Sequence, residues 1–197
     1  MARRTGRRSR LISALTGGDP VAYRDSLAAM LIAALASLVA GITLAATTGT
    51  LEELPGLLLL VPAALAVKGN IFGALGSRLG TAIHAGSFRI TANADSVVGQ
   101  NTLAAMTLTL VISVALAVMA KGVAVAFDVS PTMSVADFIV VSTIGGILAS
   151  AVILVITLLL ADASVRYDLD LDNVVAPLVT ATGDLISLPA LVWAAEL

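Results

Sequence analysis

The sequence predicts an all-α integral membrane protein built from five transmembrane helices. Its 197 residues are 58% hydrophobic and only 12% charged, and the mean hydropathy is +1.02. A soluble domain of this length needs a charged surface that so few charged residues cannot provide. The apolar residues also gather into five runs, each close to the roughly 20 residues that a helix needs to cross a bilayer. Strands of a membrane barrel would be shorter and would alternate apolar with polar residues, which these runs do not.

The five spans follow one another with short connections. The first apolar run, from Leu27 to Ala46, is too long for the core of a cleaved signal peptide (about 7–15 residues), so we expect it to stay in the protein. The second span begins after the adjacent acids Glu52 and Glu53. The predicted spans cover residues 26–46, 54–77, 97–120, 135–161 and 174–195. Residues 1–24 then form a basic leader, and residues 25–197 form one transmembrane domain.

Basic residues predict the orientation in the cytoplasmic membrane. Five of the eleven lysines and arginines lie in the first ten residues. The connections after the second and fourth spans add Arg78, Arg89 and Arg166, whereas the opposite side has only Lys121. Because basic residues favour the cytoplasmic side, we expect the N-terminus inside and the C-terminus outside. Anionic lipid explains the basic leader, and we expect no nucleic acid as a partner.

A polar stripe runs down the fifth span. A rotation of about 100° per residue brings five residues to one side of this helix, namely Asn173, Pro177, Thr180, Asp184 and Ser187. The other faces are apolar. An ionised carboxylate costs several kcal/mol in hydrocarbon, so we expect Asp184 to face a cavity or the bundle interior. Such a stripe is typical of a pore lining.

The prolines of the same span add carbonyl ligands. Pro177 and Pro189 cannot donate backbone hydrogen bonds, which leaves two carbonyls one turn earlier free. Carbonyls and a carboxylate are hard oxygen ligands that suit Mg²⁺ or Ca²⁺. Mg²⁺ sheds water reluctantly, so we expect it to meet Asp184 through its water shell. Two other roles stay open for Asp184: a structural ion pair with a buried donor such as Lys68, and a proton relay.

The charge of the cation predicts a dimer. One carboxylate cannot neutralise a divalent ion, whereas Asp184 from two chains can, around a central cation pathway near a two-fold axis. Asp168, Asp170 and Asp172 precede the fifth span. Three acids there would raise the local cation concentration, although a solvated loop explains Asp168 and Asp170 equally well. Asp172 is better placed, because it sits at the helix start, where its side chain can cap free amides.

The second span carries small residues and a second polar stripe. Gly69, Gly73 and Ser77 recur at intervals of four, a spacing that lets helices pack closely in a membrane. Helix packing does not explain Asn70, because its side-chain amide needs a hydrogen-bond partner inside the membrane. Asn70 lies at about the depth of Asp184, so the two could share one hydrated ion.

Several classes of function are excluded or disfavoured. The chain has no cysteine, which excludes disulfides and thiol chemistry, and one histidine is too few for a histidine-rich zinc site. No nucleophile–base pair or nucleotide-binding motif is present, so we expect neither an enzyme nor a cofactor. We expect Lys68 to bond to a carboxylate or a carbonyl inside the bundle, and His84 to be solvated or to cap its helix.

Three stretches resemble the MgtE-type magnesium transporter family. The segment VPAALAVKGNIFGALGSRLGTAIHAG resembles the family's Pro…Gly-Asn…Ser-Arg-Leu-x-Thr segment, in a form closer to the eukaryotic solute-carrier relatives than to the bacterial members. DLDNVVAPLVTATGDLISL resembles the Asp-Pro-Asp-Asn…Pro…Thr…Gly-Asp stretch, and NADSVVGQNTLAAMTL resembles the start of the third span. The chain departs from bacterial members at residues 71–75, where they have a second Asn followed by Gln, and at Leu171, where they have Pro.

The resemblance covers residues 25–197 and implies a single five-helix half that pairs with a second such unit around the cation pathway. It implies that Asp184 binds Mg²⁺ in the pore, and that Thr180 and Asn70 contact the water shell of the ion. Asn173 and Asp172 complete the candidate metal-contacting set. A leader of 24 residues leaves no room for the cytoplasmic Mg²⁺-sensing domains of bacterial members, so we expect no gating by them.

The sequence thus predicts transport of a divalent cation. The expected ion is Mg²⁺, and Mn²⁺ or Co²⁺ are the alternatives. The second subunit is a copy of this chain in a homodimer or a related partner in a heterodimer. Two alternatives stay open: a proton-coupled carrier of another solute, in which Asp184 titrates, and a membrane subunit that does not itself transport.

Overall fold

The computed structural model describes residues 20–53, 56–91, 93–167 and 171–197; the side chains of residues 20, 22, 50–53 and 171–174 lie outside the description. The described residues fold into five long helices. These are α2 (Pro20–Glu53), α3 (Leu57–His84), α4 (Val97–Ala126), α5 (Val135–Tyr167) and α6 (Leu171–Ala195). All five are long and apolar enough to cross a membrane, which confirms the all-α membrane class and the five predicted spans.

The predicted helix starts are accurate where a side chain caps the helix. Ser96 Oγ accepts a hydrogen bond of 2.9 Å from the Gly99 amide and begins α4 at the predicted residue. Ser134 and Asp137 exchange hydrogen bonds of 3.1 Å between side chain and amide, which begins α5. Four helices run six or seven residues past the predicted C-terminal ends (46, 77, 120 and 161), to Glu53, His84, Ala126 and Tyr167. Hydropathy marks only the lipid-buried part of a helix, and backbone bonding continues beyond it.

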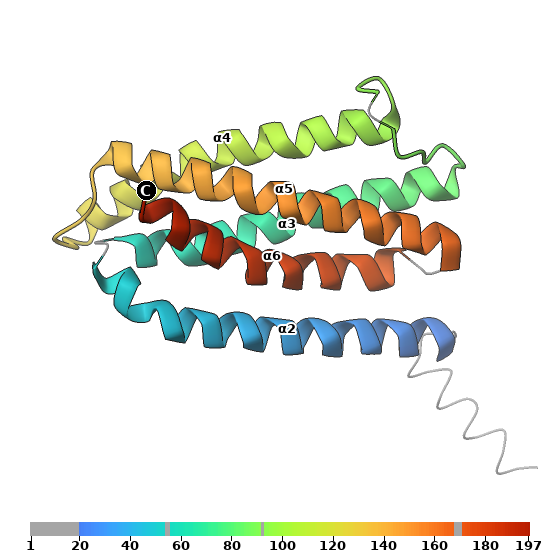
Figure 1. The fold of residues 1–197 in the computed structure, drawn as a ribbon, viewed down its shortest axis with the longest axis horizontal. Helices are drawn as coiled ribbons and strands as arrows, with labels where there is room; N and C mark the ends of the chain where they lie inside the picture. The colour runs from blue at the N-terminus through green and yellow to red at the C-terminus, as the bar shows by residue number, and fades with distance from the viewer. Residues whose placement is uncertain (1–19, 54–55, 92, 168–170) are drawn as a thin grey trace, which may run out of the picture.

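Four helices make a bundle and the fifth lies at its side (Figure 1). Helices α3, α4, α5 and α6 pack on one another, whereas α2 packs mainly against α6 and only slightly against α3. Many large apolar side chains of α2 are therefore exposed, including Leu35, Leu38 and Ile42 at 64–68%. Helix α2 begins at the same end of the bundle as the α3–α4 connection, and the chain ends at the opposite end (Figure 1).

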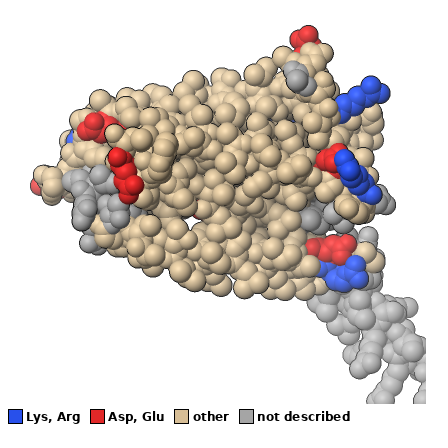
Figure 2. Space-filling view, viewed as in Figure 1, with Lys and Arg blue, Asp and Glu red and all other residues tan. Residues whose placement is uncertain are grey.

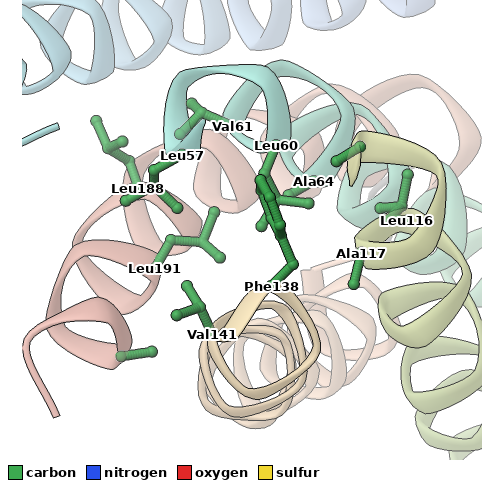
Figure 3. Close-up of a cluster of buried hydrophobic side chains, with 12 residues drawn as sticks. Leu57, Leu60, Val61, Ala64, Leu116, Ala117, Phe138, Val141, Leu188 and Leu191 are labelled. Carbon is green, nitrogen blue, oxygen red and sulfur yellow. The ribbon is translucent and has the colours of Figure 1, made fainter. Parts of the chain in front are cut away.

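The core consists of two apolar clusters. Figure 3 shows the cluster around Phe138, at the end where α3 begins, with Leu60, Leu116 and Leu191 packed about its ring. The second cluster is built on Phe72, Leu79 and other residues nearer the opposite end.

A polar layer separates the two clusters along every helix of the bundle. Its buried members are Lys68 on α3, Thr109 and Ser113 on α4, Ser142 and Ser150 on α5, and Ser187 on α6. On each helix these residues fall mostly between the positions that feed one apolar cluster and those that feed the other. Burial of a polar group is costly unless it is hydrogen-bonded, and Ser142 Oγ of this layer donates to the Ser113 carbonyl at 2.8 Å.

Candidate cation site

Helix α6 carries the candidate acid near its middle, as the sequence predicts. Asp184 is half-buried, and its Oδ2 accepts a hydrogen bond of 3.2 Å from Ser37 Oγ of α2. Ser37 itself is exposed on the side of the molecule where α2 meets α6. The carboxylate thus lies in a partly open position instead of in the packed bundle interior, where it would need a full set of partners.

Ser37 is a site residue that sequence reasoning missed. Helix α2 is almost wholly apolar, and one face of it carries Ser26, Met30, Ala33 and Ser37 at helical spacing. Two hydroxyls three turns apart on one face were a signal that this face meets a polar partner. The sequence could not say which helix supplies that partner, because α2 and α6 lie at opposite ends of the chain.

A groove of about 470 Å³ runs between α2 and α6. Its α2 wall is that same face, and its α6 wall includes Pro177 and Thr180. Thr180 is exposed, and its Oγ1 donates to the Ala176 carbonyl at 3.0 Å. The groove therefore presents Ser26, Ser37 and Thr180 beside the helix that carries Asp184, one turn beyond Thr180.

The crossing of α3 and α6 places Asn70 and Asp184 at one level. A Cβ on Gly69 would lie 3.1 Å from Thr180 Cγ2, and a Cβ on Gly183 would lie 3.7 Å from Lys68 Cβ. Gly69 therefore lets the helices approach closely, as small residues do in membrane bundles, and Gly183 lies beside Lys68 at an ordinary packing distance. Since Asn70 follows Gly69 and Asp184 follows Gly183, the structure agrees with the shared depth predicted from sequence.

The side chain of Asn70 nevertheless lies in a different groove. It is exposed, and it lines a groove between α3 and α4 that also holds Arg78 and Asn101. Its amide makes no hydrogen bond to another described residue, so the polar group at depth is free for a partner outside the protomer. Within one protomer the structure brings Thr180 and Asp184 to the α2 side and Asn70 to the α4 side.

The remaining predicted metal contacts lie at the start of α6. Asp172 and Asn173 fall in its first turn, since the helix begins at Leu171, but their side chains are outside the described residues. Asp168 and Asp170 also fall outside them. The predicted roles of these four residues at the cytoplasmic mouth stay predictions.

Ser187 is not part of the groove-facing stripe that the sequence predicts. It is only 1% exposed, and it lines a small cavity of about 10 Å³ together with Lys68 and Ser113. Its hydroxyl is buried without a hydrogen-bond partner in the described part of the chain. The stripe on α6 therefore divides, with Thr180 at the open groove and Ser187 inside the bundle.

Lys68 does not pair with Asp184, so the structural ion-pair alternative is wrong within the protomer. Lys68 is 3% exposed, and its Nζ donates to the Gly146 carbonyl at 2.9 Å and to Ser150 Oγ at 2.8 Å. Ser150 Oγ lies 3.0 Å from Thr109 Oγ1, which extends the network to α4. The predicted bond from Lys68 to a carbonyl is confirmed. His84, whose Nδ1 lies 2.8 Å from the Gly80 carbonyl, closes the last turn of α3 as predicted.

Among the described side chains, Asp184 is the one acid at the site in a protomer. Among the residues that the structure describes, no three histidine, aspartate or glutamate side chains come together as a metal cluster. The ion pairs in the same residues join Arg24 to Asp25 and Arg166 to Asp162. Among the described residues Asp184 thus has no basic partner; it has one hydroxyl donor and an open groove beside it.

Comparison with known proteins yields one match. A model of the MgtE family, described as a divalent cation transporter, matches residues 61–194, more than half of the chain. No curated protein and no solved structure matches the sequence. The matched range begins at Val61 in α3 and ends within the last turn of α6.

Proposed function

Because this chain belongs to the MgtE family of divalent cation transporters, we propose that it moves Mg²⁺ across the cytoplasmic membrane as a dimer. The observation that carries the proposal is Asp184: a carboxylate at mid-helix depth, without a basic partner among the described residues, beside an open groove. A fixed negative charge in a membrane is tolerated where it faces a wet pathway and a cation.

Mg²⁺ fits the ligand types at this position. The available atoms are carboxylate, hydroxyl and amide oxygens, which are hard ligands. A single protomer supplies too few of them for a dehydrated Mg²⁺ ion, which takes near-octahedral coordination. The ion therefore passes with most of its water shell. Asp184 accepts hydrogen bonds from that shell, and Thr180 is the matching contact one turn away. Asn70 on α3 opens on the α4 side of its own protomer, so its contact with the shell depends on how the second subunit is arranged.

Two features support a second subunit. One carboxylate leaves a divalent charge half neutralised, and a symmetric partner supplies the other half. The second feature is the exposed polar side of α3, where Asn70, Ser77 and Thr81 are open in the protomer. Polar groups at membrane depth face protein or water instead of acyl chains, so this side of α3 turns toward the partner or the pathway.

We further propose that the N-terminus faces the cytoplasm. On the face shown in Figure 2, blue side chains gather at the end where α2 begins, and the middle is free of charge. Arg24, Arg78, Arg89 and Arg166 all belong to that end, whereas Lys121 is at the other. Basic residues concentrate on the cytoplasmic side of membrane proteins.

Replacement of Asp184 tests the proposal. We expect Asp184→Asn to leave a folded dimer but to abolish Mg²⁺ flux into proteoliposomes, because the neutral amide no longer balances the charge of the ion. Asp128→Asn is the matched control. Asp128 is exposed, just after the C-terminal end of α4, and has φ 53°, a conformation that asparagine accepts. The control should keep the flux of the wild type.

The same assay separates the other readings. Normal Mg²⁺ flux in Asp184→Asn would remove Asp184 from the pathway. Flux that follows an imposed proton gradient and ignores Mg²⁺ would indicate a proton-coupled carrier. Absence of flux in the purified wild type, together with no thermal stabilisation by Mg²⁺, would indicate a subunit that does not transport, since a ligand that binds the folded state raises its stability.

A further inference from the structure

The groove between α3 and α4 is about as long as the hydrocarbon part of one lipid leaflet is thick. It has a volume of about 310 Å³, and its walls run from Val67 to Arg78 on α3 and from Asn101 to Ile112 on α4. Eleven residues of helix rise by about 16 Å. The hydrocarbon core of a bilayer is about 30 Å thick, so the groove covers about half of it.

The two parts of the groove differ in chemistry. Along most of its length the walls are apolar side chains, among them Ile71, Ala74, Ala104 and Leu108. The end nearer the α3–α4 connection holds the guanidinium of Arg78 and the amide of Asn101. This arrangement matches an amphiphile whose tail lies in the membrane and whose polar head lies at the cytoplasmic end.

Most N–H donors of the Arg78 side chain have no acceptor in the described part of the chain. It is exposed, and its Nη1 donates to Asn101 Oδ1 over a long distance of 3.4 Å. Among the side chains that the structure describes, which exclude those of residues 50–53 and 171–174, no carboxylate lies within salt-bridge distance of it, since the ion pairs there are Arg24–Asp25 and Arg166–Asp162. A guanidinium has five N–H donors in a planar fork that matches a phosphate group.

We propose that this groove is a binding site for an anionic phospholipid. One acyl chain lies along the apolar walls, and the phosphate bonds to Arg78, which Asn101 holds over the groove. Basic pockets between transmembrane helices on the cytoplasmic side are suited to anionic head groups, and the inner leaflet supplies such lipids. Asn70 lines the same groove, about two turns from Arg78, so a bound lipid would compete with an ion or a second subunit for its amide.

Lipid-dependent melting tests the site without any transport assay. The purified wild-type protein in detergent is titrated with phosphatidylglycerol or with phosphatidylcholine, and the melting temperature is followed. We expect phosphatidylglycerol to stabilise more strongly. In Arg78→Gln the phosphatidylglycerol concentration for half the shift should rise roughly tenfold, the effect of losing one charge-assisted bond, while the response to phosphatidylcholine stays unchanged.

Arg89→Gln is the matched control, because Arg89 is an exposed arginine at the same end of the bundle, in the α3–α4 connection, but outside the groove. It should keep the lipid preference of the wild type. Ala104→Phe fills the apolar part of the groove without changing any charge and should weaken the response to both lipids.

Three results would overturn the proposal. Equal stabilisation by the two lipids would show that no anionic head group is recognised. An equal loss in Arg78→Gln and Arg89→Gln would show diffuse surface attraction. A change in oligomeric state in Arg78→Gln or Ala104→Phe, without a change in lipid response, would show that a second copy of the chain covers the groove.

Discussion

At the scale of single residues, the contact between Ser37 and Asp184 decides how the carboxylate is presented. The 3.2 Å hydrogen bond holds Oδ2 toward α2 and limits the rotamers of the acid. Hydrogen bonds to charged groups contribute about 1.5–3 kcal/mol when buried, and an exposed one contributes less. We interpret Ser37 as a positioning residue that keeps Asp184 at the open groove.

Ser37→Ala should raise the Mg²⁺ concentration for half-maximal flux about fivefold, which corresponds to a loss of about 1 kcal/mol. The maximal flux should change little, because the charge is still present. Thr43→Val is the control on the same helix: Thr43 Oγ1 bonds only to the Val39 carbonyl of α2 among the described residues, so its loss should leave the flux unchanged. A lower half-saturating concentration in Ser37→Ala would show instead that Ser37 competes with the ion for Asp184.

The part of the site that lies on one helix was predictable, and the part formed between helices was not. Asp184 and Thr180 follow from helical spacing on α6, and the structure places both on its α2 side. Ser187 has the same spacing but is buried, because α6 must also present a face to Lys68 and Ser113 in the bundle. Helical spacing gives the direction in which a side chain points from its helix. Only the packing of the helices decides what lies in that direction.

At the scale of helices, the membrane spans were predictable because each apolar run is long enough to cross the bilayer. Caps fix the starts of α4 and α5 at the predicted residues. The predicted helices stop too early at their C-terminal ends, because residues such as Gly80 and Thr81 in α3 are not apolar but remain helical. The side position of α2 could not be predicted, because its apolar residues suit lipid and protein equally well.

Close contact between α5 and α6 depends on Gly145. A Cβ there would lie 3.0 Å from Leu191 Cα and 3.1 Å from the Ala190 carbonyl, and backbone atoms cannot move aside easily. Gly145→Ala should therefore lower the free energy of unfolding by about 1–3 kcal/mol, as overpacking does.

Gly122→Ala is the control for this prediction. No atom lies within 4 Å of a Cβ at Gly122, so the substitution should be neutral or should stabilise α4 by up to about 1 kcal/mol through helix propensity. Thermal melting of both variants checks the pair. Equal stability of Gly145→Ala and the wild type would mean that α5 and α6 are less tightly packed than the structure shows.

At the scale of the whole molecule, the protomer has features of half an assembly. It exposes Asn70 and Ser77 on α3, and Asp184 is its one carboxylate at mid-helix depth among the described side chains, for a doubly charged ion. The sequence led to a dimer by this charge argument and by the resemblance to the MgtE-type family. The structure adds the exposed polar side of α3, which charge counting could not locate.

The most direct test of the central claim mixes wild-type and Asp184→Asn subunits in one membrane. If both subunits of a dimer hold the ion with Asp184, one defective copy inactivates the pair, and the Mg²⁺ flux falls with the square of the wild-type fraction. At equal amounts the flux should then be about a quarter of that of the wild type, for random pairing. A flux of about half, linear in the wild-type fraction, would mean that each protomer carries its own pathway and would contradict the account.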